Sequence, residues 1–463
     1  MKNKIIFFLT LLIVFIVTIF IFFNFFWNWH NLPFNIRSLL DQSKKNYIKT
    51  ILTPYKVISE QKKKLSVYED IIGFYHLDNE NLFKNAELNF KKSLKNIALE
   101  KQIKLDLKNN LSLIKYKLNG LYSGIYKPYP GSGYLDFFND KLILLSSKGI
   151  LAYQVKFKDE ISFKQIKNNI NEFIHSEQFN KNIWFSIKDL KVHNNKIFIS
   201  FTEEIEKDCW NTSVLIGDMN YENINFHKLF SPDSCVHSKN NLDKEFNAHQ
   251  SGGRIESLDD DYIALSIGEY RSRFLAQDLN SPNGKIIKIN IQNGKYKIIS
   301  IGHRNIQGLL YDKNNNFLLA TEHGPKGGDE INLINLNKIT VSNYGWPIAS
   351  YGNHYIKKTT SNDSKYDKYP LLKSHKNNGF IEPLKYHDPS IGISEIIKIK
   401  NNFYAYSSLK AEKIYFFNLN DANELIYTYE IDINERIRDM IYKNNKIYLF
   451  LESSASIGII NLE

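Results

Sequence analysis

The sequence predicts an all-β protein built as a six-bladed β-propeller, and both a repeat and the composition support this. One short unit recurs six times after Gly131: a polar turn of Asn, Asp or Lys, then an alternating apolar strand. The copies are Asn139–Ser147, Asn194–Phe201, Asp259–Ile267, Lys313–Thr321, Lys400–Ser408 and Lys443–Leu451. Multi-strand units repeated at such intervals are typical of propeller blades. Aromatic residues make up 14% of the chain, with 28 Tyr and 31 Phe, and this share favours strands.

The strands around the repeat support the same fold. Each copy follows another apolar strand, such as Ile187–Val192, and most copies precede a third. No helix-length apolar periodicity interrupts the copies, and this argues against βαβ units. The spacing between copies is irregular, so five and seven blades are the alternatives to six.

Residues 1–30 predict a membrane anchor. Ile5 to Trp27 is an unbroken apolar run whose only polar members are Thr and one Asn, and as a helix it exceeds the roughly 30 Å hydrocarbon core. Lys2 and Lys4 precede the run, so we expect the N-terminal tip inside the cell and the rest of the chain in the periplasm. A cleaved signal peptide is the alternative, but the run ends in no A-x-A-like site.

Residues 31–118 are predicted to form an accessory or stalk region before the main domain, residues 119–463. Lys44 to Gln102 has apolar positions at roughly helical spacing, so this part is predicted to be mostly helical. Ile103 to Leu118 instead alternates on both sides of a Lys-Asn-Asn turn, and this pattern predicts a β-hairpin.

The only two cysteines, Cys209 and Cys235, flank two predicted short strands, Thr212–Ile216 and Asn223–His227. A hairpin with a cysteine at each open end brings the two sulfur atoms within disulfide range. Two free buried thiols are the alternative. Outside the cytoplasm we expect the bridge.

The net charge of +11 invites a nucleic-acid hypothesis. The lysines are, however, spread along the whole chain among Asn and Ile residues, and they form no patch aimed at phosphates. We therefore expect no nucleic-acid partner.

Unusual residues gather in the loops between the predicted strands. The segments are Ala248–Arg254, Gly302–Leu309, Glu322–Glu330, Asn343–Pro347, Ser407–Lys410 and Arg436–Asp439. If these loops meet on one face, their cations suit a multiply carboxylated ligand, because guanidinium groups bind carboxylates in a bidentate manner. The cations are Arg304, Lys410, Arg436 and Arg438. Ordinary exposed arginines on strands are the alternative interpretation.

Two further features predict metal-assisted chemistry in the same place. The Gly324-Pro325 turn offers backbone carbonyls, which are hard oxygen ligands suited to Ca²⁺. His249, in a glycine-rich loop, is suited to act as a general base near neutral pH. Taken alone, a loop histidine is usually an ordinary hydrogen-bonded residue, and such a turn is usually just a loop.

In these motifs the sequence resembles the glucose/sorbosone dehydrogenase family, which includes soluble quinoprotein glucose dehydrogenases and aldose sugar dehydrogenases. The strings G-H-R-N-x-Q-G-L, E-H-G-P-x-G-G-D-E and N-Y-G-W-P follow one another from Gly302 to Pro347 in the family's order. The resemblance spans roughly Gly131 to Ile460 and implies a six-bladed propeller.

The resemblance also implies oxidation of a sugar with pyrroloquinoline quinone (PQQ) and Ca²⁺ as cofactors. His249 matches the base that takes a proton from the anomeric hydroxyl while hydride passes to the quinone. The positions that match cofactor contacts are Arg304, Asn305, Lys410, Arg436 and Arg438. Gly324 and Pro325 match ligands of the calcium at the cofactor, and Glu330 and Tyr344 match ligands of a second, structural calcium.

The chain departs from the family pattern at three places. Glu269 stands where the family usually has an Asp that supports the catalytic His, so we expect Glu269 to act with His249 and to shift it. Asn337 to Ser342 looks inserted between the two ligands of the structural calcium, and we expect it to disturb that site. No cofactor contact from the first blade can be placed near Gly131–Gly149.

The leading hypothesis is an oxidoreductase, anchored in the membrane, that oxidises an aldose sugar or related alcohol and passes electrons to the respiratory chain. A non-catalytic propeller that binds a polymer or protein is the rival. A calcium-dependent sugar-lactone hydrolase is a third possibility, and the residues do not identify the sugar.

Overall fold

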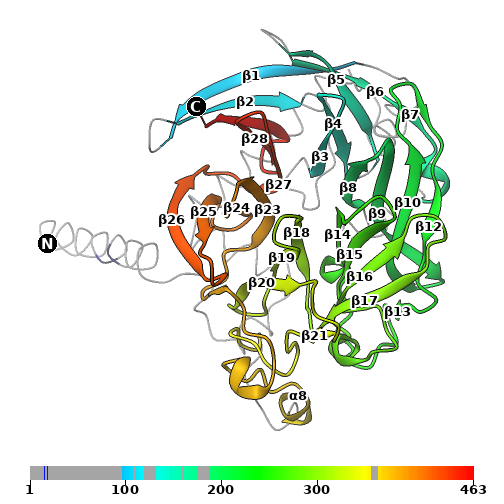
Figure 1. Cartoon of the computed structure of the whole chain (residues 1–463), viewed down its shortest axis with the longest axis vertical. Helices are drawn as coiled ribbons and strands as arrows, with labels where there is room; N and C mark the ends of the chain where they lie inside the picture. The colour runs from blue at the N-terminus through cyan, green and yellow to red at the C-terminus, as the bar shows by residue number, and fades with distance from the viewer. Residues whose placement is uncertain are drawn as a thin grey trace, which may run out of the picture. The chain divides into compact units, whose positions relative to one another are not determined.

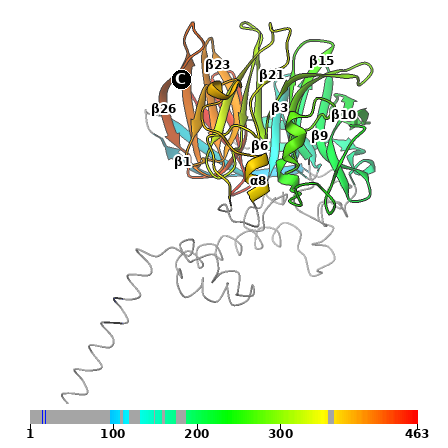
Figure 2. The same ribbon diagram turned by 90° about the horizontal axis from the view of Figure 1, so that it is seen from below.

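The computed structural model describes residues 96–107, 111–118, 132–147, 149–157, 161–174, 187–355 and 363–462, together with positions 15 and 18. The chain divides into two compact units, residues 1–72 and 73–463, and all described residues except positions 15 and 18 belong to the second. The described part of this second unit is a ring of six blades of mainly antiparallel strands, the predicted six-bladed β-propeller (Figure 1). Figure 2 shows the ring edge-on, with the blade strands running between its two faces.

The blades follow one another in chain order. Blade 1 contains β3 (Gly133–Phe138), β4 (Lys141–Ser146), β5 (Leu151–Phe157) and β6 (Ile161–Gln165); blade 2 contains β8 (Ile187–His193), β9 (Lys196–Glu206), β10 (Cys209–Asp218) and β12 (His227–Phe230). Blade 3 contains β14 (Gly252–Ser257), β15 (Tyr262–Ile267), β16 (Lys285–Asn290), β17 (Tyr296–Ile301) and β21 (Ser342–Asn343); blade 4 contains β18 (Ile306–Asp312), β19 (Phe317–Glu322), β20 (Asp329–Asn335) and β22 (Lys385–His387). Blade 5 contains β23 (Ile393–Lys400), β24 (Phe403–Ser408), β25 (Lys413–Leu419) and β26 (Leu425–Asp432); blade 6 contains β27 (Ile437–Lys443), β28 (Lys446–Leu451), β29 (Ser456–Asn461) and β2 (Ser112–Leu118).

The long strand β1 and several short elements complete the fold. They are the strands β1 (Asn96–Asp106), β7 (Lys167–Asn168), β11 (Asn223–Ile224) and β13 (Val236–His237), the 3-10 helices η3 (Ile170–Glu172), η4 (Ala248–Gln250), η5 (Arg273–Gln277) and η6 (Lys376–Asn378), and the helix α8 (Asp363–Lys368).

The recurring unit of the sequence is the second strand of each blade together with the turn before it. In three blades that turn has two residues, both with positive φ: Asn139 and Asp140, Asn194 and Asn195, and Asn444 and Asn445. Asn and Asp tolerate this left-handed conformation better than most residues, and it matches the twist of a tight hairpin. The polar turns therefore set the register of the inner two strands.

The N-terminal hairpin closes the ring. β2 pairs antiparallel with β29, from Leu113 opposite Ile460 to Lys117 opposite Ser456, and so forms the outer strand of blade 6. β1 then pairs with β2 on one side and with β6 of blade 1 on the other, which joins blades 6 and 1 into one sheet of nine strands. The predicted hairpin at Ile103 to Leu118 is present, and it belongs to the propeller sheet (Figure 1).

One part of the helical prediction for Lys44 to Gln102 is wrong. Residues 96–102 belong to β1, because backbone pairing on both edges of this segment overrides its local spacing of apolar residues. The remaining residues of that prediction lie outside the described part of the chain. So does the predicted anchor Ile5–Trp27 apart from positions 15 and 18, and no helix among the described residues is long and apolar enough to cross a membrane.

The predicted disulfide is confirmed. Cys209 begins β10, and Cys235 directly precedes β13, which pairs antiparallel with β10. The two Cα atoms lie 5.4 Å apart and the sulfur atoms are bonded.

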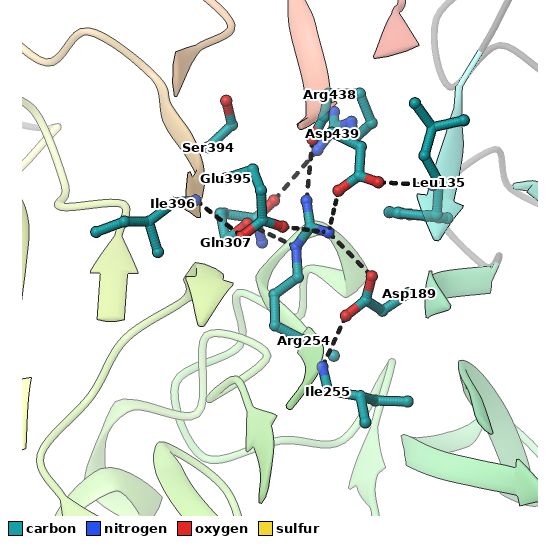
Figure 3. Close-up of polar contacts among 12 residues, drawn as sticks. Leu135, Asp189, Arg254, Ile255, Gln307, Ser394, Glu395, Ile396, Arg438 and Asp439 are labelled. Atoms are coloured by element: carbon teal, nitrogen blue, oxygen red, sulfur yellow. Dashed lines mark hydrogen bonds and ion pairs between the residues drawn. The ribbon is translucent and has the colours of Figure 1, made fainter. Parts of the chain in front are cut away.

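The buried guanidinium of Arg254 lies among carboxylates that belong to several inner strands (Figure 3). Nη1 of Arg254, on β14, lies 2.9 Å from Asp189 of β8, 2.7 Å from Glu395 of β23 and 2.7 Å from Asp439 of β27. The Arg254 side chain is only 4% exposed, so these ion pairs are shielded from water. The inner strands of four blades therefore meet at one cation.

The other two blades join the same cluster through hydrogen bonds. Nε of Arg254 donates to the carbonyl oxygen of Gln307 on β18 at 2.6 Å. Oδ2 of Asp439 accepts from the backbone N–H of Leu135 on β3 at 2.7 Å. All six inner strands thus contact Arg254 or one of its carboxylate partners.

We predict that Leu113→Ala destabilises the protein by about 2–5 kcal/mol, because Leu113 is fully buried where β2 packs into blades 5 and 6. Leu105, its neighbour across the hairpin on β1, is 36% exposed, so Leu105→Ala is the matched control and should cost no more than about 0.5 kcal/mol. Urea unfolding of the two variants measures this difference. Equal losses would show that closure by β2 does not stabilise the ring.

Candidate active site

A cavity of about 360 Å³ is lined by residues from all six blades. Its wall contains most of the predicted site residues: His249, Arg304, Asn305, Gly324, Pro325, Lys410, Arg436 and Arg438. Three predicted site residues, Glu269, Glu330 and Tyr344, do not line it. Loops that are scattered over some 190 positions of the sequence therefore meet in one place.

Blade topology explains this convergence. His249, Arg304 and Arg436 lie just before the inner strands β14, β18 and β27, whereas Gly324 and Lys410 lie just after the second strands β19 and β24. In an antiparallel hairpin the start of the first strand and the end of the second lie at the same end. All five residues therefore reach the same face of the ring.

His249 lies in the short helix η4, where its backbone N–H donates to Oδ1 of Asn247 at 2.9 Å. Burial lowers the pKa of the imidazole to about 3, and the cations Lys188 and Arg438 contribute to the shift. The ring is therefore neutral at pH 7 and has one nitrogen without a proton.

Arg304 is held in the wall of the cavity by two backbone carbonyls. Its Nη1 donates to the carbonyl oxygens of His323 at 2.8 Å and Gly324 at 2.7 Å. Its guanidinium carbon lies 5.3 Å from the centroid of the Trp346 ring, a cation–π contact. One face of this cation thus rests on an aromatic ring.

Arg436 and Arg438 share one buried carboxylate. Nε of Arg436 donates to Oε2 of Glu452 at 2.8 Å, and Nη2 of Arg438 donates to Oε1 at 3.0 Å. Burial alone would raise the pKa of Glu452, but the two guanidinium groups hold it below its ordinary value. Two cations against one anion leave a net positive charge on this side of the cavity.

The turn after β19 offers oxygen ligands. A Cβ atom added at Gly324 would lie 2.1 Å from the carbonyl oxygen of Gly328, so only glycine allows the two chain segments to approach this closely. The backbone N–H of Gly324 donates to Oδ1 of Asp329 at 3.1 Å, and Gly324, Pro325 and Asp329 all line the cavity. Carbonyl and carboxylate oxygens suit Ca²⁺. Within the described residues, no cluster of three or more His, Cys, Asp or Glu side chains is arranged to hold a metal ion.

Glu269 lies behind the cavity wall and is fully buried. With the Gln250 amide nitrogen facing it, Glu269 accepts a hydrogen bond from Gln250, whose oxygen accepts from Nη2 of Arg304 at 2.9 Å. Burial raises the pKa of Glu269 to about 7, against the opposing effects of Arg304 and Arg273. Glu269 is therefore linked to the residue that follows His249 in the chain and to a cation of the cavity.

Glu330 and Tyr344 do not line the cavity, and both are buried next to His375. Nε2 of His375 is 3.3 Å from Oε1 of Glu330, and Nδ1 of His375 is 2.9 Å from the carbonyl oxygen of Tyr344. An imidazole thus stands between the two positions that match calcium ligands.

The cavity is also lined by residues that the sequence did not indicate, among them Tyr134 and Lys188. Tyr134, on β3 of blade 1, lines the cavity, and its ring centroid lies 5.2 Å from the guanidinium carbon of Arg254. Lys188, on β8, is half-buried and lies near His249, and desolvation lowers the pKa of its amine to about 7. The strand predicted at Ile187–Val192 directly precedes a copy of the repeat, so it is the first strand of its blade. Lys188 lies at its start, and this position could have indicated a lysine in the cavity wall.

The fold and the cavity define a class of protein: a six-bladed propeller whose blade loops surround a cationic pocket with a neutral imidazole in its wall. Residues 188–460 match the family described as "Glucose / Sorbosone dehydrogenase". This match covers more than half of the chain, so the protein belongs to the glucose/sorbosone dehydrogenase family.

Named relatives match shorter segments. The chain is 36% identical over 117 residues to aldose sugar dehydrogenase YliI of Escherichia coli, covering 22% of this chain and 30% of that protein. It is 30% identical over 202 residues to quinoprotein glucose dehydrogenase B of Acinetobacter calcoaceticus, covering 31% of this chain and 41% of that protein. The matched segments thus span less than half the length of these two curated relatives.

The fold is also that of a solved structure. The soluble aldose sugar dehydrogenase of Escherichia coli in the apo-form aligns with a TM-score of 0.56 at 20% identity, over 73% of this chain and 97% of that one. At this identity the likeness supports the propeller fold alone.

We predict that Glu269→Gln removes a pH-dependent part of the stability. Because the pKa of the folded carboxyl is raised from 4.5 to about 7, its contribution is fully present below pH 4.5 and is lost as the pH rises through about 7. The stability of the wild type should therefore fall relative to that of Glu269→Gln by about 3 kcal/mol across this window. Urea unfolding from pH 4 to 8 measures the difference, and parallel curves for the two proteins would contradict the prediction.

Proposed function

We propose that this protein is a PQQ-dependent dehydrogenase that oxidises an aldose sugar or a related alcohol. One observation supports the proposal above the others: His249, four cations and the Gly324-Pro325 turn line a single cavity. The names of the two relatives, an aldose sugar dehydrogenase and a quinoprotein glucose dehydrogenase, agree with this chemistry.

The cavity fits a flat, polyanionic cofactor. Arg304, Lys410, Arg436 and Arg438 would hold the carboxylates of PQQ, and Asn305 would add a hydrogen bond. The carbonyl of Pro325, together with the second lone pair of the Gly324 carbonyl that accepts from Nη1 of Arg304, would hold Ca²⁺. When bound, PQQ would supply the capacity to accept hydride, and Ca²⁺ would supply Lewis acidity.

The protein's own part in the reaction is proton transfer and orientation. His249 is neutral at pH 7, so its ring can take the proton of the substrate hydroxyl as the carbon is oxidised. Lys188 and Arg438, which also line the cavity, would stabilise negative charge that develops on the substrate oxygen. Glu269 would act as a positioning residue through Gln250.

We also propose that residues 5–27 anchor the protein in a membrane, with the propeller in the periplasm and a component of the respiratory chain as electron acceptor. The Cys209–Cys235 disulfide supports an oxidising compartment, because such bridges are rare in the cytosol. The apolar run in the sequence supports the anchor.

The first test of this function is reconstitution. Purified protein supplied with PQQ and Ca²⁺ should reduce an electron-accepting dye when given members of a panel of aldoses. Failure to bind the cofactor would favour the non-catalytic propeller. Sugar-lactone hydrolysis that needs Ca²⁺ but no quinone would favour the hydrolase.

We predict that His249→Ala lowers kcat roughly 10²- to 10⁴-fold, because the general base is lost, while cofactor affinity changes little. His227, which is exposed on β12, gives the matched control His227→Ala with unchanged activity. Steady-state dye reduction and cofactor titration measure the two quantities. A His249→Ala enzyme as active as the wild type would exclude His249 as the base.

We predict that Lys410→Met weakens PQQ binding roughly tenfold to a hundredfold, the loss expected for one hydrogen bond to a charged group. Lys313→Met is the control, since Lys313 is exposed and lies outside the cavity. Calorimetric titration with the cofactor tests this. Equal affinities of the Lys410→Met and Lys313→Met proteins would remove Lys410 from the cofactor site.

A further inference from the structure

The buried contacts of His375 link parts of the chain that are far apart in the sequence. Glu330 lies on β20 of blade 4, Tyr344 directly follows β21 of blade 3, and His375 precedes η6 in the segment between β21 and β22. All three are buried, with exposures of 6%, 2% and 1%. The imidazole therefore joins two blades and the long connection between β21 and β22 at a single point.

The hydrogen-bond geometry settles the role of one ring nitrogen. Nδ1 of His375 lies 2.9 Å from the carbonyl oxygen of Tyr344, and a carbonyl oxygen only accepts, so Nδ1 carries a hydrogen and donates. Nε2, on the other side of the ring, faces Oε1 of Glu330 at 3.3 Å. The ring thus spans the gap between the carboxylate and the carbonyl.

The surroundings hold this ring in place. Tyr351 stacks on His375 with 5.4 Å between ring centroids and an angle of 10° between the planes. The backbone N–H of Phe380 donates to the carbonyl oxygen of His375 at 3.0 Å. Oε2 of Glu330 faces Nδ2 of Asn332 at 3.4 Å, so protein groups face both carboxylate oxygens.

A calcium ion does not fit this arrangement. Ca²⁺ takes six to eight oxygen ligands. Between Glu330 and Tyr344 lies the imidazole of His375 instead. Its Nδ1–H group donates to the carbonyl oxygen of Tyr344, one of the two oxygens that such an ion would need. The donor set that the family resemblance assigns to a structural calcium is therefore already used by a side chain.

We infer that His375 takes the place of the second calcium in this protein and forms a metal-independent clasp between blades 3 and 4. The clasp also supports the cavity. Tyr344 is two residues before Trp346, whose ring contacts the guanidinium of Arg304. The ring of Tyr344 stacks on that of His303, with 4.8 Å between the ring centroids. This inference does not depend on the proposed function.

The test is the calcium content of the full chain, measured by mass spectrometry after gel filtration, for wild type and Glu330→Gln, each with and without PQQ and added Ca²⁺. We expect Glu330→Gln to contain as much calcium as the wild type in both states, and its thermal midpoint to fall by a few degrees. Asp312→Asn removes another buried carboxylate, which lies 2.8 Å from Nζ of Lys398, and serves as the control for loss of an ion pair.

Loss of one calcium ion per chain in Glu330→Gln, but not in Asp312→Asn, would overturn the inference. If Glu330→Gln does not fold, the wild type decides by itself: two calcium ions per chain with the cofactor bound would overturn the clasp, and one or none would support it. Absence of calcium from every sample would leave the clasp supported while removing Ca²⁺ from the proposed function, so the two failures are distinguishable.

Discussion

The structure depends on one buried cation in the centre of the ring. The guanidinium of Arg254 is surrounded by Asp189, Glu395 and Asp439, which belong to three other blades. Burial raises the pKa values of Asp189 and Glu395, since three carboxylates cannot all be ionised around one cation at little cost. Removing one partner of such a buried ion pair typically lowers the free energy of unfolding by about 3–5 kcal/mol. Separation of the inner strands would break these ion pairs, so the cluster holds the strands together.

The same cation forms part of the candidate active site. Arg254 lines the cavity, and its Nη2 donates to the carbonyl oxygen of Arg438 at 2.9 Å. Arg438 is one of the residues proposed to hold the cofactor. Nη1 of Arg438 in turn donates to Oε1 of Gln307 at 3.2 Å, and Nε of Arg254 binds the Gln307 carbonyl. The interaction that holds the blades together therefore also places the side chains of the cavity before any ligand binds, and such preorganisation favours binding and catalysis.

Three kinds of link connect the blades. The Arg254 cluster joins the inner strands. The hairpin of β1 and β2 joins blades 6 and 1 along their outer edges, because β2 pairs with β29 and β1 pairs with β6. His375 joins blades 3 and 4 through Glu330 and the backbone of Tyr344. A ring closed in this way has no free sheet edge between blades 6 and 1, where the chain would otherwise open.

The sequence by itself determined the features that are local. The six repeats, the Asn and Asp turns such as Asn194-Asn195, and the motif loops that converge at His249 and Arg304 all follow from short-range patterns, because strand alternation and turn chemistry involve neighbouring residues. Only the tertiary structure decided which partner each segment meets. Residues 96–102 became a strand, Glu269 contacted Gln250, and His375 entered between Glu330 and Tyr344, since pairing and burial depend on residues far away in the chain.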